Sequence, residues 1–247
     1  MTDNLSLFIE DFKRVRKLGF ISSLRSNSTG IGKTFEEHIG VRENNITEPD
    51  LHGFEIKSQR NLSSSYVTLF TKAPTMPKGA NSYLRESYGS QDVKYPDIKV
   101  LHTSIFHGRF NTHSAGANFS LEIDYQEQRL YILIERTDGS IDRSVYYSFD
   151  ALRQAIKKIE NLAFIRADTK KLGDIEQFHF TKATIFYDFI SFEKFLESIE
   201  SGLIMYDVRI GAYKTGKNKG KTHDHGSGFR IKREYMGMLY HEHVEVV

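Results

Sequence analysis

The chain of 247 residues contains no cysteine and no long run of apolar residues. The absence of cysteine excludes disulfide bonds and zinc sites built on thiolates. No stretch of 18 or more apolar residues occurs, so the sequence predicts no transmembrane helix. Residues 1–4 lack the basic and apolar regions of a secretory signal peptide. We therefore expect a cytoplasmic protein that does not associate with a membrane.

Charge is small in total but unevenly distributed. The chain carries a formal net charge of +2 at neutral pH. Residues 209–233 contain eight lysines and arginines and one aspartate, a local charge of +7, so the remaining residues carry −5. A basic segment on a mildly acidic body is typical of a protein that binds a polyanion. The lysines of this segment are expected to contact DNA phosphates: Lys214, Lys217, Lys219 and Lys221.

Two carboxylates and a lysine lie close together near the end of the first fifth of the chain. The segment 54–58 alternates apolar and polar residues, as a half-buried strand does, and places Glu55 and Lys57 on one face. Asp50 precedes them across a turn that Gly53 permits. Asp50 and Glu55 could hold Mg²⁺, and Lys57 could lie beside an attacked phosphate. The other interpretation is an exposed surface strand.

A third carboxylate, Glu36, lies on the short helix predicted just before this segment. It could orient Lys57 or share the metal, or it could be an ordinary exposed residue. The same stretch contains the Gly-Lys-Thr that ends a nucleotide-binding P-loop. That motif requires a glycine at position 27, which is Asn27, and no apolar strand leads into it, so a nucleoside triphosphate site is disfavoured.

The segment 222–226 reads Thr-His-Asp-His-Gly and lies inside the basic region. Its two histidines could suggest zinc, but the ligand spacings of a structural zinc site are absent. Base reading in the major groove fits the residue types better, since histidine and arginine donate to guanine and aspartate accepts from cytosine. A solvated loop is the alternative. The candidate readers are Asp207, Arg209, His223, His225 and Arg230.

Hydrophobic periodicity predicts a mixture of helices and strands. We expect helices near residues 5–18, 33–39, 149–159 and 192–199. We expect strands near residues 54–58, 66–71, 100–106, 119–123, 130–135, 163–167, 178–187, 205–213 and 229–231. No internal repeat or low-complexity linker interrupts them. The sequence thus predicts one α/β domain over residues 1–247, with two lobes around a cleft.

These motifs together resemble the MvaI/BcnI group of type II restriction endonucleases, which is related to the MutH nicking endonuclease. The matching segments occur in the same order and are spread over nearly the whole chain: 29–36, 49–57, 69–72, 79–81, 145–150, 207–213 and 216–230. The likeness is poor between about residues 88 and 117. That stretch is expected to be rich in loops and contains His102, His107, Arg109 and His113, which could approach DNA and affect how the central base pair is read.

The resemblance implies the PD-(D/E)XK nuclease fold with a mixed central sheet. It implies a DNA cleft between a catalytic lobe of about residues 1–160 and a recognition lobe of residues 161–247. It implies that Asp50 and Glu55 are metal ligands, Lys57 the catalytic lysine and Glu36 an accessory carboxylate. Asp207, Arg209, His223, His225 and Arg230 would read G·C pairs. The implied enzyme is a monomer that uses Mg²⁺ to cut double-stranded DNA one strand at a time, and its host is expected to contain a cognate methyltransferase that forms no complex with it.

Three alternatives remain at this point. The resemblance favours the target CCWGG, in which W is A or T, but CCSGG, in which S is C or G, is the other target of the group. A MutH-like enzyme that nicks one strand with a partner protein has the same catalytic residues. A DNA-binding module without catalysis is the alternative from a different class.

Overall fold

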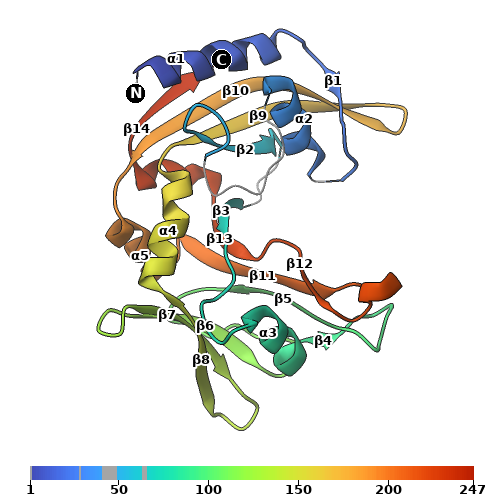
Figure 1. The fold of residues 1–247 in the computed structure, drawn as a ribbon, viewed down its shortest axis with the longest axis vertical. Helices are drawn as coiled ribbons and strands as arrows, with labels where there is room; N and C mark the ends of the chain where they lie inside the picture. The colour runs from blue at the N-terminus through green and yellow to red at the C-terminus, as the bar shows by residue number, and fades with distance from the viewer. Residues whose placement is uncertain (1, 28, 41–48, 63–65) are drawn as a thin grey trace. The chain divides into compact units, whose positions relative to one another are not determined.

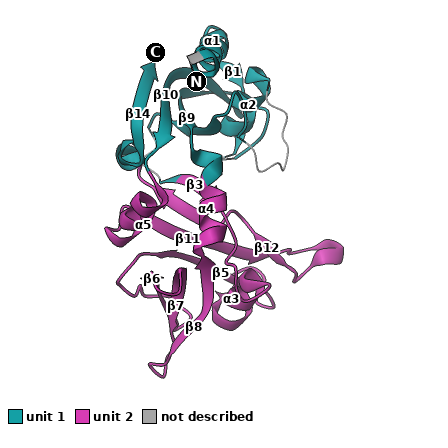
Figure 2. Cartoon of the chain, turned by 60° about the vertical axis from the view of Figure 1, so that its left-hand side comes forward, with its two compact units in different colours: residues 1–67, 157–190, 233–247 teal, residues 68–156, 191–232 magenta. Residues whose placement is uncertain are grey.

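The structure is a computed structural model that describes residues 2–27, 29–40, 49–62 and 66–247. The chain folds into two compact units (Figure 2). Unit 1 contains Met1–Val67, Lys157–Ile190 and Arg233–Val247, and unit 2 contains Thr68–Ile156 and Ser191–Lys232. The units thus alternate along the chain and do not follow the single boundary near residue 160 that the sequence predicts. Which unit cuts and which unit reads stays a prediction.

Unit 1 is built on a mixed five-stranded sheet (Figure 1). The strands follow the order β1-β10-β9-β2, and β14 pairs with the other part of β10. Their bounds are β1 (Ile21–Ser22), β2 (Glu55–Arg60), β9 (Leu162–Leu172), β10 (Ile175–Phe189) and β14 (Tyr240–Val246). Strand β2 runs parallel to β9, whereas the other pairs are antiparallel. Two short 3₁₀ helices, η1 (Lys157–Ile159) and η3 (Arg233–Leu239), also belong to this unit.

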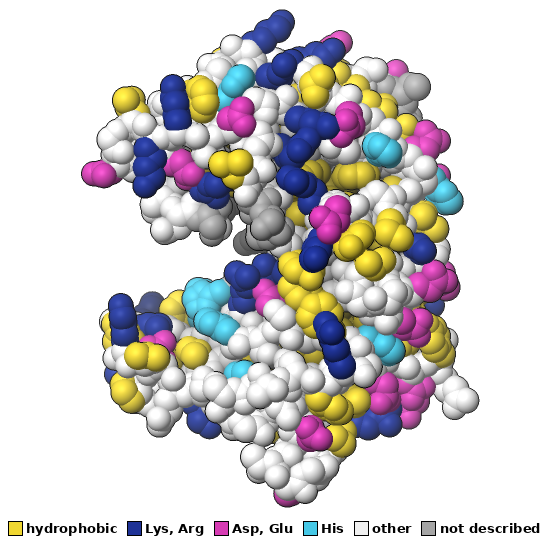
Figure 3. All heavy atoms as spheres, turned by 180° about the vertical axis from the view of Figure 1, so that it is seen from behind, with side chains coloured by type: hydrophobic (Ala, Val, Ile, Leu, Met, Phe, Trp, Pro, Cys, Tyr) yellow, Lys and Arg dark blue, Asp and Glu magenta, His cyan; other side chains and the backbone are white. Residues whose placement is uncertain are grey.

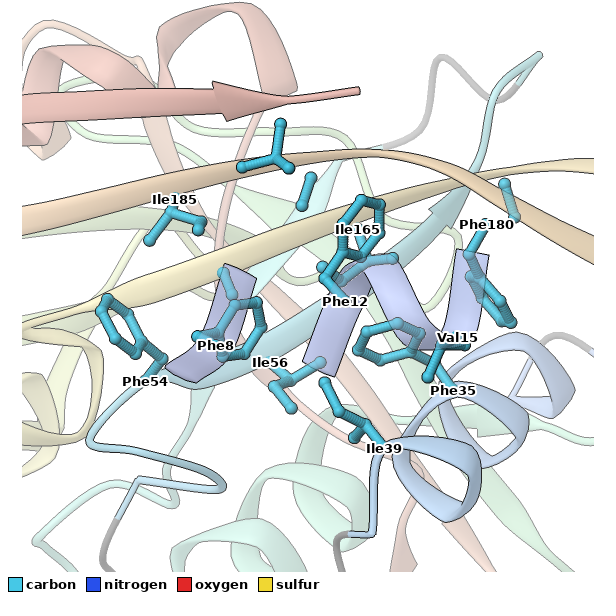
Figure 4. Packing of buried hydrophobic residues seen from close by; sticks show 14 of the residues in the cluster. Phe8, Phe12, Val15, Phe35, Ile39, Phe54, Ile56, Ile165, Phe180 and Ile185 are labelled. Carbon is cyan, nitrogen blue, oxygen red and sulfur yellow. The ribbon is translucent and has the colours of Figure 1, made fainter. Parts of the chain in front are cut away.

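One face of this sheet is covered by α1 (Thr2–Arg16) and α2 (Gly30–Ile39). Apolar residues at helical spacing, among them Phe8, Phe12 and Phe35, meet the alternate residues of the strands, such as Ile56 and Ile165 (Figure 4). Because side chains alternate along a strand, burial of Ile56 against the helices places Glu55 and Lys57 on the opposite face. The hydrophobic core therefore determines the face on which the carboxylate and the lysine lie.

Unit 2 contains a six-stranded and a three-stranded sheet. The larger one has the order β3-β13-β11-β5-β4, with β12 also paired to β11, and the smaller one has the order β6-β7-β8. The strands are β3 (Val67–Thr71), β4 (Ser90–Gln91), β5 (Lys99–Ile105), β6 (Asn118–Asp124), β7 (Arg129–Glu135), β8 (Ile141–Ser148), β11 (Ile204–Ala212), β12 (Thr222–Asp224) and β13 (Gly228–Ile231). The helices are α3 (Ala80–Tyr88), α4 (Phe149–Ile156), α5 (Phe192–Glu200) and the 3₁₀ helix η2 (Gly216–Asn218).

An aromatic cluster forms the centre of unit 2. Phe229 on β13 lies within ring contact of Phe70, Tyr147, Phe195 and Tyr206. Offset and edge-on aromatic pairs add to the stabilisation that comes from apolar burial. Because Phe229 is next to Arg230 along β13, this packing fixes the strand that carries one predicted base reader.

The expected mixture of helices and strands is confirmed, with several differences. Helix α3 was not expected, because Leu84 is the one strongly apolar residue among its buried positions. Strands β9 and β10 extend past the expected ends, since backbone pairing between them continues to Leu172 and Ile175 although these residues are exposed. Strands β8 and β14 were not expected either, whereas β5, within the stretch 88–117, was. None of the helices in the described part of the chain is long and apolar enough to cross a membrane.

Phe35 offers a test of the core that supports the candidate site. Its side chain is fully buried, and its ring centroid lies 4.9 Å from that of Phe180 and 6.3 Å from that of Phe12. Phe35→Ala is expected to lower the free energy of unfolding by about 3–5 kcal/mol, because it leaves a cavity. Urea unfolding followed by circular dichroism measures this. The exposed neighbour is the control: Glu37→Ala should change stability by less than about 0.5 kcal/mol, and equal losses would contradict the packing described.

Candidate functional site

A tight turn places Asp50 against the first residues of β2. Leu51 and Phe54 exchange backbone hydrogen bonds of 3.2 and 2.8 Å, and the two residues between them, His52 and Gly53, have positive φ angles of 49° and 80°. Positive φ at both central positions is the conformation of a type I′ turn, which glycine adopts without strain. The turn brings the Asp50 carboxylate to the Ile56 backbone N–H, which donates to its Oδ2 at 2.8 Å.

Glu55 is a buried carboxylate with a lysine at each oxygen. Its residue exposure is 4%. Lys57 Nζ donates to Oε1 at 2.5 Å, and Lys158 Nζ lies 3.2 Å from Oε2. The alternative interpretation of an exposed surface strand is therefore wrong. A buried charge is costly without partners, and the two ammonium groups supply them.

The donor set fits a divalent cation that prefers oxygen ligands. Oε2 of Glu55 is buried and accepts no hydrogen bond from any described residue, although Lys158 Nζ lies 3.2 Å away. Among the described residues, no three side chains of His, Asp or Glu are grouped so as to hold a metal ion. Asp50 and Glu55 alone would leave coordination positions for water and a substrate phosphate, as is usual for Mg²⁺.

Glu36 lies on α2, which packs on β2, and both elements belong to unit 1. It is half-buried, and its Oε1 lies 3.6 Å from the place where a side chain on Gly32 would begin. The structure thus brings the helix of Glu36 to the strand of Glu55 and Lys57. It does not group Glu36 with Asp50 and Glu55 as a three-carboxylate metal cluster.

Asp207 on β11 joins two of the predicted readers in unit 2. Its Oδ2 accepts from Arg209 Nε at 2.6 Å and lies 3.1 Å from Arg230 Nε, while Ser104 donates to its Oδ1 at 3.0 Å. Burial lowers the pKa of Arg230, and the neighbouring Asp207 acts in the opposite direction. The carboxylate therefore pairs with two arginines and holds them on adjacent strands.

The two histidines of the 222–226 segment are also brought together. The His223 ring is stacked on Tyr213 at 4.6 Å and meets the His225 ring edge-on at 4.5 Å. Gly211 makes room for His225, because a Cβ there would lie 2.7 Å from His225 Nε2. Histidine side chains gather beside lysines and arginines on unit 2 in the lower part of Figure 3.

Asp224, between these histidines, has a structural role. Its Oδ1 accepts from the backbone N–H groups of Gly226 and Ser227 at 3.0 and 2.7 Å and from the Ser227 hydroxyl at 2.8 Å. Asn81 donates to its Oδ2 at 2.9 Å. These bonds close the turn after β12 and fix the backbone that carries His223 and His225.

A depression of about 510 Å³ connects part of this group to β5. His102, exposed on β5, is paired directly with Arg209 across the β5–β11 ladder. Both line the depression together with Asp207 and His225. His102 thus joins the candidate readers. His113, from the same stretch of the chain, packs edge-on against Phe119.

The four predicted phosphate-contacting lysines divide into two pairs. Lys214 forms an ion pair with Asp92, and Lys219 lies 2.7 Å from Asp97. Lys217 and Lys221 are exposed and form no ion pair with a described residue. Sequence position alone could not distinguish the pairs, since both aspartates come from the poorly matched stretch 88–117.

The comparisons with known proteins define the class of the protein. The family model of the MvaI/BcnI restriction endonuclease family matches residues 9–240. The solved structure of restriction endonuclease MvaI in complex with its cognate DNA is 37% identical, with a TM-score of 0.90 and complete coverage of both chains. MvaI in the absence of DNA is 37% identical, with a TM-score of 0.62 and coverage of 100% of this chain and 99% of that chain. No curated protein matches the sequence.

The chain is therefore a type II site-specific deoxyribonuclease with a mixed α+β fold. It belongs to the MvaI/BcnI restriction endonuclease family. Membership implies sequence-specific binding and cleavage of double-stranded DNA, and restriction endonucleases of this type generally use divalent metal ions. The resemblance seen in the sequence motifs is confirmed.

The histidine pair predicts a pH dependence. Burial lowers the pKa of His225 below its usual 6.5, and His223 and His102 lower it further by charge repulsion. Although much of this side chain is exposed, its ring packs on Gly211 and His223. The neutral form is therefore favoured in the folded state. As the pH falls through 6.5, the unfolded chain takes up the proton first, so this histidine makes the fold less stable in acid.

His223→Asn is expected to raise the pKa of His225 part of the way toward 6.5, because it removes repulsion but leaves burial. A titration of the histidine ring protons by NMR measures the change. His113 is an internal control in the same spectra, since burial alone lowers its pKa. An unchanged His225 titration, or an equal shift at His113, would contradict the coupling of the two rings.

Proposed function

We propose that this enzyme is a Mg²⁺-dependent endonuclease that cleaves double-stranded DNA at CCWGG. The observation that carries the proposal is the buried Glu55 carboxylate, paired with Lys57 and adjacent to Asp50, in a chain that is similar over its full length to MvaI. We further infer a cytoplasmic monomer that cuts one strand at a time. A cognate methyltransferase protects the host DNA and forms no lasting complex with the enzyme.

Each residue of unit 1 has a distinct part in this proposal. Asp50 and Glu55 would hold Mg²⁺, which supplies activation of a water molecule and stabilisation of the leaving oxygen. Lys57, held at Oε1 of Glu55, presents a positive charge to the attacked phosphate. Glu36, on the helix beside them, acts as the accessory carboxylate. Catalysis is thereby assigned to unit 1.

Base reading is assigned to unit 2. Arg209 and Arg230, which Asp207 holds on adjacent strands, offer forked donors that suit guanine O6 and N7. Asp207 can accept a hydrogen bond from cytosine N4 with the oxygen lone pairs that Arg209 and Arg230 do not use. His223 and His225 are the further readers of G·C pairs. Lys217 and Lys221 contact phosphates, as do Lys214 and Lys219 once they exchange their aspartates for DNA.

The target and the chemistry are tested by digestion of two plasmids, one with only CCWGG sites and one with only CCSGG sites, in the presence of Mg²⁺. Double-strand cleavage at CCWGG alone is expected, with ends that map to the site. Cleavage at CCSGG alone would reassign the central base pair. A persistent nick would favour a MutH-like enzyme, and random ends or no cleavage would overturn the proposal.

In the same assay, Lys57→Ala should abolish cleavage and retain specific binding measured by gel shift, because the lysine acts on the phosphate and reads no base. Lys13→Ala, a change of the same kind at an exposed position of α1, is the matched control and should cut at the normal rate. Undiminished cleavage by Lys57→Ala would remove this residue from the mechanism. A DNA-binding module without catalysis would show binding but no cleavage even without substitution.

Readers and phosphate contacts can be separated by Arg230→Ala and Lys217→Ala. Loss of Arg230 is expected to cost about 1–3 kcal/mol of discrimination at one base pair. Loss of Lys217 should weaken binding to all sequences equally and flatten the salt dependence, because one fewer phosphate is neutralised. Binding titrations against single-substitution duplexes at several salt concentrations measure both effects. A changed sequence preference in Lys217→Ala would refute this division.

A further inference from the structure

A second lysine contacts the buried catalytic carboxylate from a distant part of the sequence. Lys158 belongs to η1, which follows α4, and its Nζ lies 3.2 Å from Oε2 of Glu55. Lys57 takes the other oxygen, Oε1, at 2.5 Å. Each oxygen of Glu55 therefore has its own cation. The proposed mechanism uses Lys57 and leaves Lys158 without a function.

The backbone around Lys158 is fixed on both sides. The carbonyl of the next residue, Ile159, accepts a hydrogen bond of 2.8 Å from the hydroxyl of Tyr240, which is itself buried on β14. Three residues after Lys158, the carbonyl of Asn161 accepts from the backbone N–H of Glu55 at 2.9 Å. The segment is thus tied both to β14 and to the first residue of β2. The position of Lys158 follows from these ties.

The two lysines hold Glu55 in different ways. Lys57 makes a directed hydrogen bond, whereas Oε2 accepts no hydrogen bond from a described residue and has only the charge of Lys158 nearby. An undirected ion pair is replaced more readily than a directed one, since no hydrogen-bond geometry is lost. The side chain of Lys158 is 32% exposed, so its ammonium group can withdraw into water.

We propose that Lys158 is a positioning residue that holds Oε2 of Glu55 in the metal-free enzyme and competes with the divalent cation for that oxygen. This inference rests on the proposed function, because it takes Glu55 to be a metal ligand. A cation that approaches Oε2 encounters the repulsion of Lys158, which must move away before the cation binds. Lys158 thereby raises the metal concentration at which the site fills, and it keeps the buried charge neutralised until then.

The direct test is metal binding by the full-length protein without DNA. Mn²⁺ is titrated into the protein and the dissociation constant is measured by calorimetry. Lys158→Met should bind Mn²⁺ on the order of tenfold more tightly, because the competing charge is gone while the length of the side chain is kept. Lys158→Arg retains the charge and should bind within about twofold of the unsubstituted protein. Lys157→Met is the matched control, since Lys157 is exposed and forms no ion pair with a described residue.

A second measurement reports on the metal-free state. Without metal, Lys158→Met should unfold at a lower temperature than Lys157→Met, because Glu55 then has one buried oxygen without a counter-charge. Saturating Mn²⁺ should remove most of this difference, since the cation replaces the lost ammonium group. Circular dichroism before the titrations identifies any variant that has failed to fold, and Lys158→Arg then carries the comparison.

The outcomes separate this inference from the proposed function. If Lys158→Met binds Mn²⁺ as the unsubstituted protein does, or more weakly, the competition is refuted while the nuclease assignment stands. If the unsubstituted protein neither binds Mn²⁺ nor cuts DNA, the proposed function itself fails. Tighter Mn²⁺ binding by Lys158→Met, with no change in Lys157→Met, supports the competition.

Discussion

A carboxylate that is removed from water must have positive or hydrogen-bonding neighbours, and Glu55 imposes this requirement on unit 1. Its position on β2 is set by Ile56 and Phe54, whose burial on either side of it leaves no freedom to turn the strand over. Lys57 from the same strand and Lys158 from η1 then balance the charge. The helices α1 and α2, the turn at Gly53 and Tyr240 at the start of β14 all help to hold this carboxylate in position.

Unit 2 contains a second carboxylate under a similar constraint. Asp207 is nearly buried and has an arginine from its own strand and another from β13 as partners. In unit 1 an oxygen, Oε2 of Glu55, accepts no hydrogen bond from a described residue, which suits a cation that can displace Lys158. In unit 2 the surplus is guanidinium N–H, which suits a base edge or a phosphate. The same arrangement, a buried acid between two basic side chains, thus produces opposite preferences for ligands because the type and geometry of the partners differ.

Local patterns made several features predictable. The apolar spacing of α1 and α2 and the alternation in β2 are properties of neighbouring residues, so the helices, the strand and the common face of Glu55 and Lys57 could be expected. The Gly-Lys-Thr of residues 32–34 lies within α2, where Thr34 is buried and accepts from the Leu24 backbone N–H at 3.0 Å. By contrast, the interleaving of the two units could not be seen, because it depends on which strands pair across more than a hundred residues.

The sequence by itself determined which chemical groups the protein has and which of them share a strand: Asp50, Glu55 and Lys57 near one end, and the arginines and histidines near the other. These relations span few residues and follow from the geometry of a strand or a turn. Only the tertiary structure decided that Lys158 reaches Glu55, that His102 lies beside Arg209, and that Lys214 and Lys219 are paired with aspartates. Each of these contacts joins distant segments through sheet pairing or loop closure, and their free energy depends on distances that no local pattern encodes.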